Sequence, residues 1–215
     1  MQRLIRQFSY RFICGMLLLS GTASPASAER TIVIIRHAEK PNQGLGQLSC
    51  RGLNRSLALA PMLLERYGRP IAIYAPNPAI KKNDNGIAYA YVRPLATIEP
   101  LAISAGLPVT LDWGMSDTEP LARMILAKAN GTQIIAWEHH WAETLARQLL
   151  SKLGEDPTVV PTWGDSDFDG IFVIRGIKDA QNKEQITFSR EAETLPDLSD
   201  QCPHQRAIAP QSNNR

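Results

Sequence analysis

The stretch Thr31-Ile32-Val33-Ile34-Ile35-Arg36-His37 decides the fold class of this chain. Its first five residues are apolar or β-branched without interruption, which predicts a strand buried on both faces, as in a parallel sheet. The run stops abruptly at Arg36-His37. Ligands of open α/β sheets bind beyond the carboxyl ends of the strands, so this pair is a candidate functional site.

Strand and helix patterns alternate along the chain after this run. The expected elements are a helix over about 53–67, a strand over 71–75, a loop over 76–91, a helix over 95–105, a strand over 109–111, a helix from 116 or 117 to about 130, a strand over 133–137, a helix over 141–153, and strands 170–175 and 185–188, which could form a hairpin at a sheet edge. This alternation implies right-handed crossovers and therefore an α/β fold of three layers, α/β/α, with a largely parallel sheet.

Length and composition fit one globular domain. The chain has 215 residues, of which 44% are hydrophobic and 20% charged, enough for one sizeable core. We place this domain at residues 29–195. Residues 196–215 are polar, with scattered Pro, Ser and Asn and no apolar period, and we expect a mobile tail there.

Residues 1–28 have the layout of a cleavable signal peptide. Arginines precede the apolar run 12–19, and the small residues Ala26-Ser27-Ala28 follow it. The apolar run is far shorter than the roughly 20 residues of a membrane span. We expect cleavage after this triplet and a periplasmic or secreted protein without a membrane anchor; an uncleaved anchor is the alternative.

The formal charge changes sign when the signal peptide is removed. The full chain carries 23 basic and 21 acidic side chains, and loss of Arg3, Arg6 and Arg11 leaves 20 against 21. Such a balance gives no reason to expect binding to nucleic acid or to a membrane surface.

The cysteines exclude some kinds of chemistry. Cys14 lies within the apolar run and lacks the setting of a lipid-modified cysteine, while Cys50 and Cys202 belong to no Cys-x-x-Cys pair. Thiol redox chemistry and a cysteine zinc site therefore have little support. In an oxidising compartment Cys50 and Cys202 could form one bridge, or each could remain a thiol.

Histidines follow two of the strongest predicted strands. One strand ends at Arg36-His37, and another passes from Trp137 into Glu138-His139-His140. If these strands are parallel, both groups emerge at the same edge of the sheet. Arg93 stands at the start of a predicted helix, where the helix dipole favours an anion.

Four segments together resemble the histidine phosphatase superfamily, which includes the phosphoglycerate mutase clan and small phosphohistidine phosphatases. They are Ile-Ile-Arg-His-Ala-Glu-Lys at 34–40, Leu-Ser-Cys-Arg-Gly-Leu at 48–53, Tyr-Val-Arg-Pro-Leu-Ala-Thr at 91–97 and Ile-Ala-Trp-Glu-His at 135–139. The resemblance covers about residues 31–175. It departs from the family at Ala38, where Arg-His-Gly is usual, and this alanine demands a backbone without positive φ.

The resemblance implies a phosphatase that acts through His37 as the nucleophile and forms a covalent phosphohistidine. Arg36 and Arg93 would grip the phosphate oxygens, and His139, in preference to His140, would complete the ring of donors. This core needs no metal and no cofactor, and its partner would be a small phosphorylated substrate.

The proton donor for the leaving group is not identified by any motif. The candidates are Glu39, Asp112, Asp117 and Glu119. Substrate specificity is expected from the loop at 76–90 and the segment around 112–120. Phosphatase is favoured over mutase because an exported protein meets little glycolytic intermediate.

Two other functions compete with the phosphatase hypothesis. The first is a phospho-ligand binding protein without turnover, since the acid is unassigned. The second is a metal-dependent hydrolase, because His37-Ala38-Glu39 matches the His-x-Glu half of a zinc deaminase and His139-His140 could be ligands. The Pro-Cys-x-x-Cys half is absent, and adjacent histidines rarely bind one ion.

Overall fold

The computed structural model describes residues 29–203 except 129, 180 and 182. The segment predicted as a signal peptide, 1–28, lies outside the described residues. The elements in chain order are β1 Glu29–Arg36, α1 Cys50–Tyr67, β2 Ala72–Tyr74, β3 Lys81–Asp84, β4 Ile87–Ala90, α2 Arg93–Ala105, β5 Val109–Thr110, α3 Thr118–Ala127, β6 Gly131–Trp137, α4 His139–Lys152, the short 3-10 helix η1 Pro157–Val159, β7 Gly170–Lys178 and β8 Glu184–Ala192. None of these helices is both long and apolar enough to cross a membrane.

The main sheet has the largely parallel character predicted from the alternating pattern. Its strand order is β5-β2-β6-β1-β7-β8, and the first four strands of this order run parallel. The last two strands, β7 and β8, pair antiparallel and form the hairpin at the sheet edge. The predicted α/β fold is confirmed.

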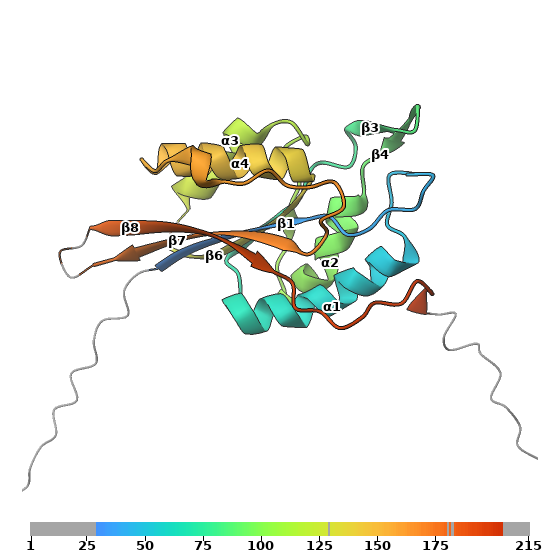
Figure 1. Ribbon diagram of the computed structural model, residues 1–215, viewed down its shortest axis with the longest axis horizontal. Helices are drawn as coiled ribbons and strands as arrows, with labels where there is room; N and C mark the ends of the chain where they lie inside the picture. Colours follow the sequence, from blue (N-terminus) through green and yellow to red (C-terminus); the bar gives the residue numbers. More distant parts are fainter. Residues whose placement is uncertain (1–28, 129, 180, 182, 204–215) are drawn as a thin grey trace, which may run out of the picture.

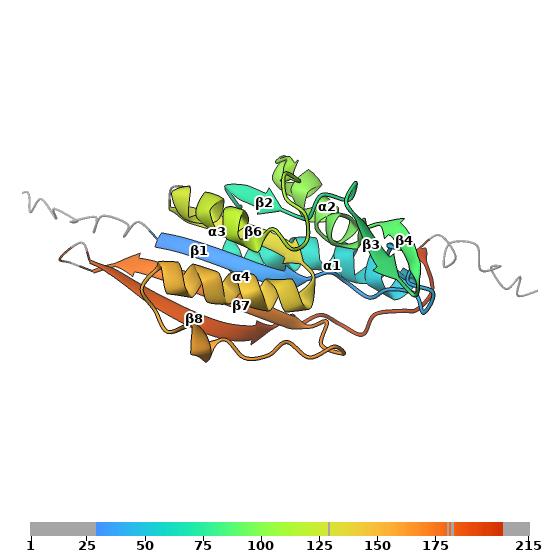
Figure 2. The same ribbon diagram turned by 90° about the horizontal axis from the view of Figure 1, so that it is seen from above.

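Helices cover both faces of the sheet and make three layers (Figure 1). Helices α3 and α4 lie on one face, and α1 and α2 lie on the other. Alternate residues of β1 serve the two cores, since Ile32 and Ile34 pack towards α3 and α4 while Val33 and Ile35 pack towards α1 and α2. The view from above shows α4 lying along β1 and β7 (Figure 2). The apolar run of β1 is therefore buried on both faces, as a central parallel strand requires.

The loop expected over 76–91 contains a second, two-stranded sheet. Lys81–Asp84 pairs antiparallel with Ile87–Ala90 around a turn at Asn85 and Gly86, whose φ angles are 52° and 85°. Asn-Gly is the preferred sequence for such a tight turn because both positions need positive φ. The strands were missed because they are short and mostly exposed, without an apolar alternation. The hairpin lies beyond the carboxyl end of β1 (Figures 1 and 2).

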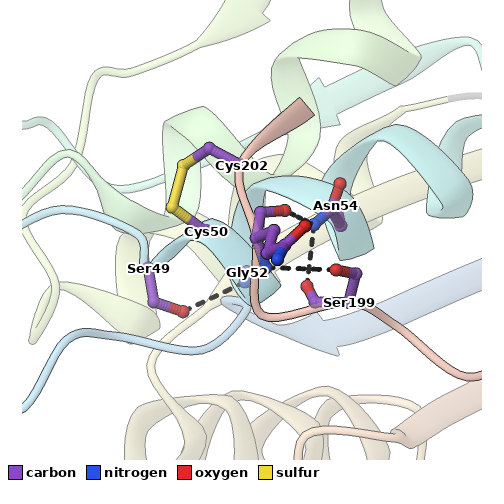
Figure 3. Close-up of a disulfide and its surroundings, with 7 residues drawn as sticks. Ser49, Cys50, Gly52, Asn54, Ser199 and Cys202 are labelled. Atoms are coloured by element: carbon purple, nitrogen blue, oxygen red, sulfur yellow. Dashed lines mark hydrogen bonds between the residues drawn. A yellow bond between two sulfur atoms is a disulfide. The ribbon is translucent and has the colours of Figure 1, made fainter. Parts of the chain in front are cut away.

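A disulfide joins Cys50 to Cys202, which answers the question that the sequence left open. Cys50 is the first residue of α1, directly after Ser49, whose hydroxyl accepts a hydrogen bond from Gly52 N at 3.1 Å. Figure 3 shows the bridge beside this capped first turn. The bond ties the end of the described chain to the helix that follows the Arg36-His37 segment.

Part of the segment expected to be a mobile tail from 196 onward lies against α1. Asn54 on α1 donates to the carbonyl oxygens of Ser199 and Gln201, both at 2.8 Å (Figure 3). These side chain to backbone bonds, together with the disulfide, hold the segment up to residue 203 against α1. They depend on tertiary contacts with residues about 145 positions away, which the local composition does not reveal. Residues 204–215 lie outside the described part of the chain.

Replacing both Cys50 and Cys202 with serine should lower the free energy of unfolding by about 4 kcal/mol, because the bridge closes a loop with a sequence separation of 152. Urea unfolding of the oxidised protein and the double variant measures this difference. Wild-type protein under reducing conditions is the matched control and should resemble the variant. Equal stability of all three samples would contradict the prediction.

Candidate functional site

The pairing of β1 with β6 brings the two predicted histidine segments together. Arg36 is the register partner of Trp137, and His37 N donates to Trp137 O at 2.9 Å. The residues that follow each strand, His37 on one side and Glu138-His139 on the other, therefore leave the same edge of the sheet. The expected juxtaposition of the histidines is what the parallel register produces.

Helix α2 positions the turn after His37. The Thr97 hydroxyl accepts from Ala38 N at 2.9 Å and donates to Arg93 O at 2.8 Å, so the helix and the turn are linked through one side chain. Ala38 is fully buried and its φ is not positive, so alanine is tolerated where the resembling family has glycine. The helix begins at Arg93, two residues before the predicted start at 95, and Arg93 N donates to Gly46 O, so this amide serves the neighbouring loop instead of an anion.

The His37 imidazole is neutral and has a fixed tautomer. Its Nδ1 lies 2.8 Å from the carbonyl oxygen of Ala38, and because a carbonyl only accepts, Nδ1 carries the proton. Burial, together with the positive charges of Arg93 and Arg36, lowers the pKa from its ordinary value of 6.5 to about 3. The second nitrogen, Nε2, makes no hydrogen bond within the described residues and keeps its lone pair.

A loop over residues 164–168 covers Arg36. Arg36 Nη1 donates to the carbonyl oxygens of Asp165 at 2.7 Å and Asp167 at 2.9 Å, with Gly164 O at 3.3 Å, and the guanidinium stacks 3.9 Å from the Phe168 ring centre. Burial of the guanidinium lowers its pKa. Nε of Arg36 is buried and finds no acceptor among the described residues. Nη1 of Arg36 is thus occupied by the loop, whereas Nε can still donate a hydrogen bond.

The β3–β4 hairpin supplies Asp84 as the partner of Arg93. The sequence analysis did not single out Asp84. Arg93 is 1% exposed, and its Nη1 forms a short ion pair with Asp84. Asp84 also accepts from Gly46 N at 3.2 Å and lies 3.4 Å from Lys40 Nζ. Burial opposes ionisation of Asp84, but its bond to Arg93 outweighs this and lowers the carboxyl pKa. The Asn85-Gly86 turn was the available sequence signal for this hairpin.

The same hairpin brings Lys82 close to the site. Lys82 Nζ lies 3.8 Å from Glu138 Oε1 and 5.0 Å from the centre of the Tyr91 ring. Tyr91 meets the His37 ring edge-on, with ring centres 5.9 Å apart. Burial raises the pKa of the Tyr91 hydroxyl, which has no hydrogen-bond partner in the described part of the chain. Both residues escaped prediction because their positions depend on the fold of the hairpin.

Glu138 is buried and caps α4. Its Oε2 accepts from the backbone amides of His140 at 3.1 Å and Trp141 at 3.2 Å, so the helix begins at His139, two residues earlier than predicted. Burial opposes ionisation, but His139, Lys82 and the amides outweigh it and lower the Glu138 pKa to about 2. Nδ1 of His139 lies 2.9 Å from Glu138 Oε1 without the alignment of a hydrogen bond.

The other nitrogen of His139 points to the loop over Arg36. Nε2 lies 2.8 Å from Asp165 Oδ1, and His140 Nε2 lies 3.6 Å from the same oxygen. The two imidazole centres are 4.0 Å apart, so His140 lies beside His139, and Glu138 provides the cap of the helix. Glu138, His139 and His140 also offer ligand atoms that all lie within 4.8 Å of one another.

The structure holds Glu39, one candidate proton donor, in a different network. Arg55 binds its carboxylate with two hydrogen bonds, of 2.8 Å and 2.9 Å, and also contacts Asp169 and Glu193. Burial opposes ionisation of Glu39, but the Arg55 bonds outweigh it and lower the pKa, which is unfavourable for a proton donor at neutral pH. Glu39 instead connects the His37 turn to α1.

The remaining candidate acids make no contact with the four predicted site residues. Asp117 accepts from Gly114 N at 2.9 Å next to the start of α3, and Glu119 pairs with Lys152 at 2.7 Å. Asp112 is exposed. Besides Glu138, the described structure brings to His139 the carboxylate of Asp165, for which the sequence offered no signal beyond an acidic, Gly-flanked loop.

Unpartnered polar atoms concentrate around His37. Eight buried side-chain nitrogen or oxygen atoms among the described residues have no hydrogen-bond partner, and four belong to Arg36, Tyr91, Arg93 and His139. Burial of an unpaired polar group costs about 1–3 kcal/mol, so such a concentration in one place indicates a ligand-binding site. Since the arginine nitrogens and the hydroxyl can donate, the complementary ligand is an anion.

No known family model and no curated protein sequence matches the chain. Its fold is similar to a solved structure assigned as phosphohistidine phosphatase SixA of Nakamurella multipartitia, with 12% identity, a TM-score of 0.46, and coverage of 78% of this chain and 98% of that one. It is also similar to a histidine-to-alanine mutant of phosphoserine phosphatase from Entamoeba histolytica in complex with phosphoserine, with 12% identity, a TM-score of 0.46, and coverage of 77% and 98%. Similarity at this level assigns no activity to the chain.

Replacing Asp84 with asparagine should lower the free energy of unfolding by about 3 kcal/mol, because Arg93 would keep a buried charge without its counterion. Thermal or urea unfolding measures the loss. Glu65→Gln, which removes one exposed negative charge from α1, is the control and should change little. Equal losses in the two variants would show that the buried ion pair stabilises the fold no more than an exposed charge does.

His37 should stay neutral, with its proton on Nδ1, down to about pH 4, because its pKa is lowered to about 3. Imidazole nitrogen shifts in an NMR titration measure this. Since the unfolded chain takes up this proton near pH 6.5, acid below that value should favour unfolding. A His37 titration near pH 6.5 in the folded protein would contradict the prediction.

Proposed function

We propose that this chain is a phosphomonoester hydrolase that forms a phosphohistidine on His37. The observation that carries the proposal is the His37 imidazole itself, which is neutral, fixed through Nδ1, and uncommitted at Nε2. A neutral nitrogen with a free lone pair is what nucleophilic attack on phosphorus requires. The motif resemblance described above points to the same residue.

The surrounding charges suit the transition state of phosphoryl transfer. Negative charge spreads over three equatorial oxygens in that state, and guanidinium groups match it in geometry. We assign Arg36 and Arg93 to these oxygens, with their unpartnered Nε groups as support. His139 would donate from Nε2 once Asp165 leaves it, which adds a third donor.

The proposed reaction has two steps. In the first, a bond forms between His37 Nε2 and phosphorus, the bond from phosphorus to the leaving oxygen breaks, and that oxygen receives a proton. In the second, water attacks the phosphohistidine, a proton leaves the water, and inorganic phosphate departs. Splitting the reaction in this way replaces one difficult displacement with two easier ones.

A metal-dependent hydrolase is the second candidate, favoured by the clustering of Glu138, His139 and His140. Several of their atoms already have partners, however, because Glu138 caps α4 and Nε2 of each imidazole faces Asp165. Among the described residues, Nδ1 of His139 has no hydrogen-bond partner. Activity that survives exhaustive dialysis against a chelator would count against this candidate.

A phospho-ligand binding protein of the same fold would bind phosphate esters without turnover.

We further propose that the enzyme acts on small phosphorylated substrates outside the cytoplasm. The signal-peptide pattern supports the location, and so does the Cys50–Cys202 disulfide, since disulfides persist in oxidising compartments. The exported location also favours a phosphatase over a mutase. Lys82 and Lys40 beside the site suit substrates with further negative charge.

Replacing His37 with asparagine should reduce hydrolysis of an aryl phosphate at least about 1,000-fold, because the nucleophile is lost. Wild-type protein mixed with a labelled aryl phosphate and quenched in alkali should carry an acid-labile phosphoryl adduct that the variant lacks. Circular dichroism checks that the variant is folded.

Glu65→Gln is the matched control, since Glu65 is exposed on α1 and has no assigned role in the reaction. It should retain turnover and the adduct. Unchanged turnover in the His37 variant would overturn the mechanism. Binding of phosphate esters by wild-type protein without any turnover would favour the binding protein.

A further inference from the structure

The proposed reaction lacks an assigned acid, and the inference below rests on that proposed function. Glu39 is committed to Arg55, and Asp117 and Glu119 are occupied at α3. The described structure brings a different carboxylate to the site, that of Asp165. Asp165 lies in the loop before β7.

Asp165 contacts two of the four predicted site residues. Its carbonyl oxygen accepts from Arg36 Nη1 at 2.7 Å, and its Oδ1 accepts from His139 Nε2 at 2.8 Å. Because a carboxylate only accepts, His139 carries a proton on Nε2 and offers it to an anion. The carboxylate thus occupies a donor that a phosphate oxygen would take.

The loop around Asp165 is anchored after the aspartate and open at its tip. Trp163 Nε1 donates to Asp167 O at 3.1 Å, and Asp167 Oδ1 accepts from the amides of Asp169 at 3.1 Å and Gly170 at 2.8 Å. The Asp165 side chain, in contrast, is 87% exposed. It can therefore leave His139 by a local rotation while the base of the loop stays in place.

His37 lies on the buried side of this arrangement, with 3% of its surface exposed. A nucleophile that attacks from within expels the leaving group on the opposite side, in line with the new bond. The solvent side, where the leaving oxygen must depart, is the side on which the exposed Asp165 carboxylate lies. A carboxyl group that is exposed and bound to His139 can therefore reach the leaving oxygen from the solvent side.

We propose that Asp165 is the general acid of the first step and the general base of the second. The incoming phosphate displaces the carboxylate from His139 and stands beside it. The displaced carboxylate takes up a proton from the solvent, and the Asp165 carboxyl then gives this proton to the leaving oxygen as the bond to phosphorus breaks. In the second step the resulting carboxylate takes a proton from the attacking water, which restores the acid.

The change of partner explains how one carboxyl group can serve both steps. In the described structure the hydrogen bond from His139, with the nearby charges of His140 and Arg36, lowers the Asp165 pKa. Loss of the His139 bond and approach of a phosphate dianion both act in the opposite direction, since like charges disfavour the ionised form. Substrate binding therefore promotes protonation of the acid it needs.

A competing interpretation gives Asp165 only a positioning effect on His139. The two interpretations differ in their dependence on the leaving group. An acid matters for a poor leaving group such as an alkoxide and hardly at all for 2,4-dinitrophenolate, whereas a misplaced His139 slows both reactions equally. The comparison of two esters therefore separates them.

The test measures the first chemical step of Asp165→Asn with ethyl phosphate and with 2,4-dinitrophenyl phosphate in rapid-mixing experiments. We expect a loss of about 100-fold or more with ethyl phosphate. With the dinitrophenyl ester we expect a burst of dinitrophenolate at nearly the wild-type rate, followed by slow release of phosphate. The variant would then accumulate phosphohistidine.

Two further variants sharpen the result. Asp165→Glu should recover part of the ethyl phosphate rate, and Ser166→Ala, in the same exposed loop tip, should behave as wild type. An equal loss of the first step with both esters, or no loss with either, would overturn the assignment. Failure of wild-type protein to hydrolyse either ester would instead refute the proposed function, and this inference with it.

Discussion

The parallel pairing of β1 with β6 is the constraint on which the rest of the structure depends. It aligns Arg36 with Trp137, so that the chain leaves the sheet at His37 and at Glu138-His139 side by side. Both strands are fully buried around this point, and helices cover both faces. A slip of one residue in register would turn every side chain to the opposite face, so the apolar cores on both sides protect the alignment.

Burial at this edge decides the electrostatics of the site. A buried imidazole close to two guanidinium groups remains neutral, which is the form that a nucleophile needs, while the buried carboxyl groups of Asp84 and Glu138 remain ionised because cations or backbone amides bind them. The arginines keep unpartnered donors in this environment, and an anion is the ligand that completes their hydrogen bonds.

Two segments outside the main sheet complete the site. The β3–β4 hairpin brings Asp84 and Lys82, which fix Arg93 and approach Glu138. The loop over 164–168 binds Arg36 through its carbonyl oxygens and His139 through Asp165. The hairpin contributes the buried carboxylate of Asp84, whereas the loop contributes the exposed carboxylate of Asp165. This difference is the basis for assigning positioning to the first and proton transfer to the second.

The sequence by itself determined the three-layer fold and most element boundaries within a few residues, because apolar periodicity is a local signal. Strand ends and the motif resemblance led to the proposal of Arg36, His37, Arg93 and His139 as the site. Tertiary structure alone decided the partners of these residues. Asp84 lies on short exposed strands that carry no apolar pattern, and Asp165 lies in a loop whose contact with His139 spans 26 positions. Glu39 was a plausible acid by sequence, but in the structure its carboxylate binds Arg55. A partly buried carboxylate needs a cation as partner, and only the tertiary packing decides which cation lies close to it.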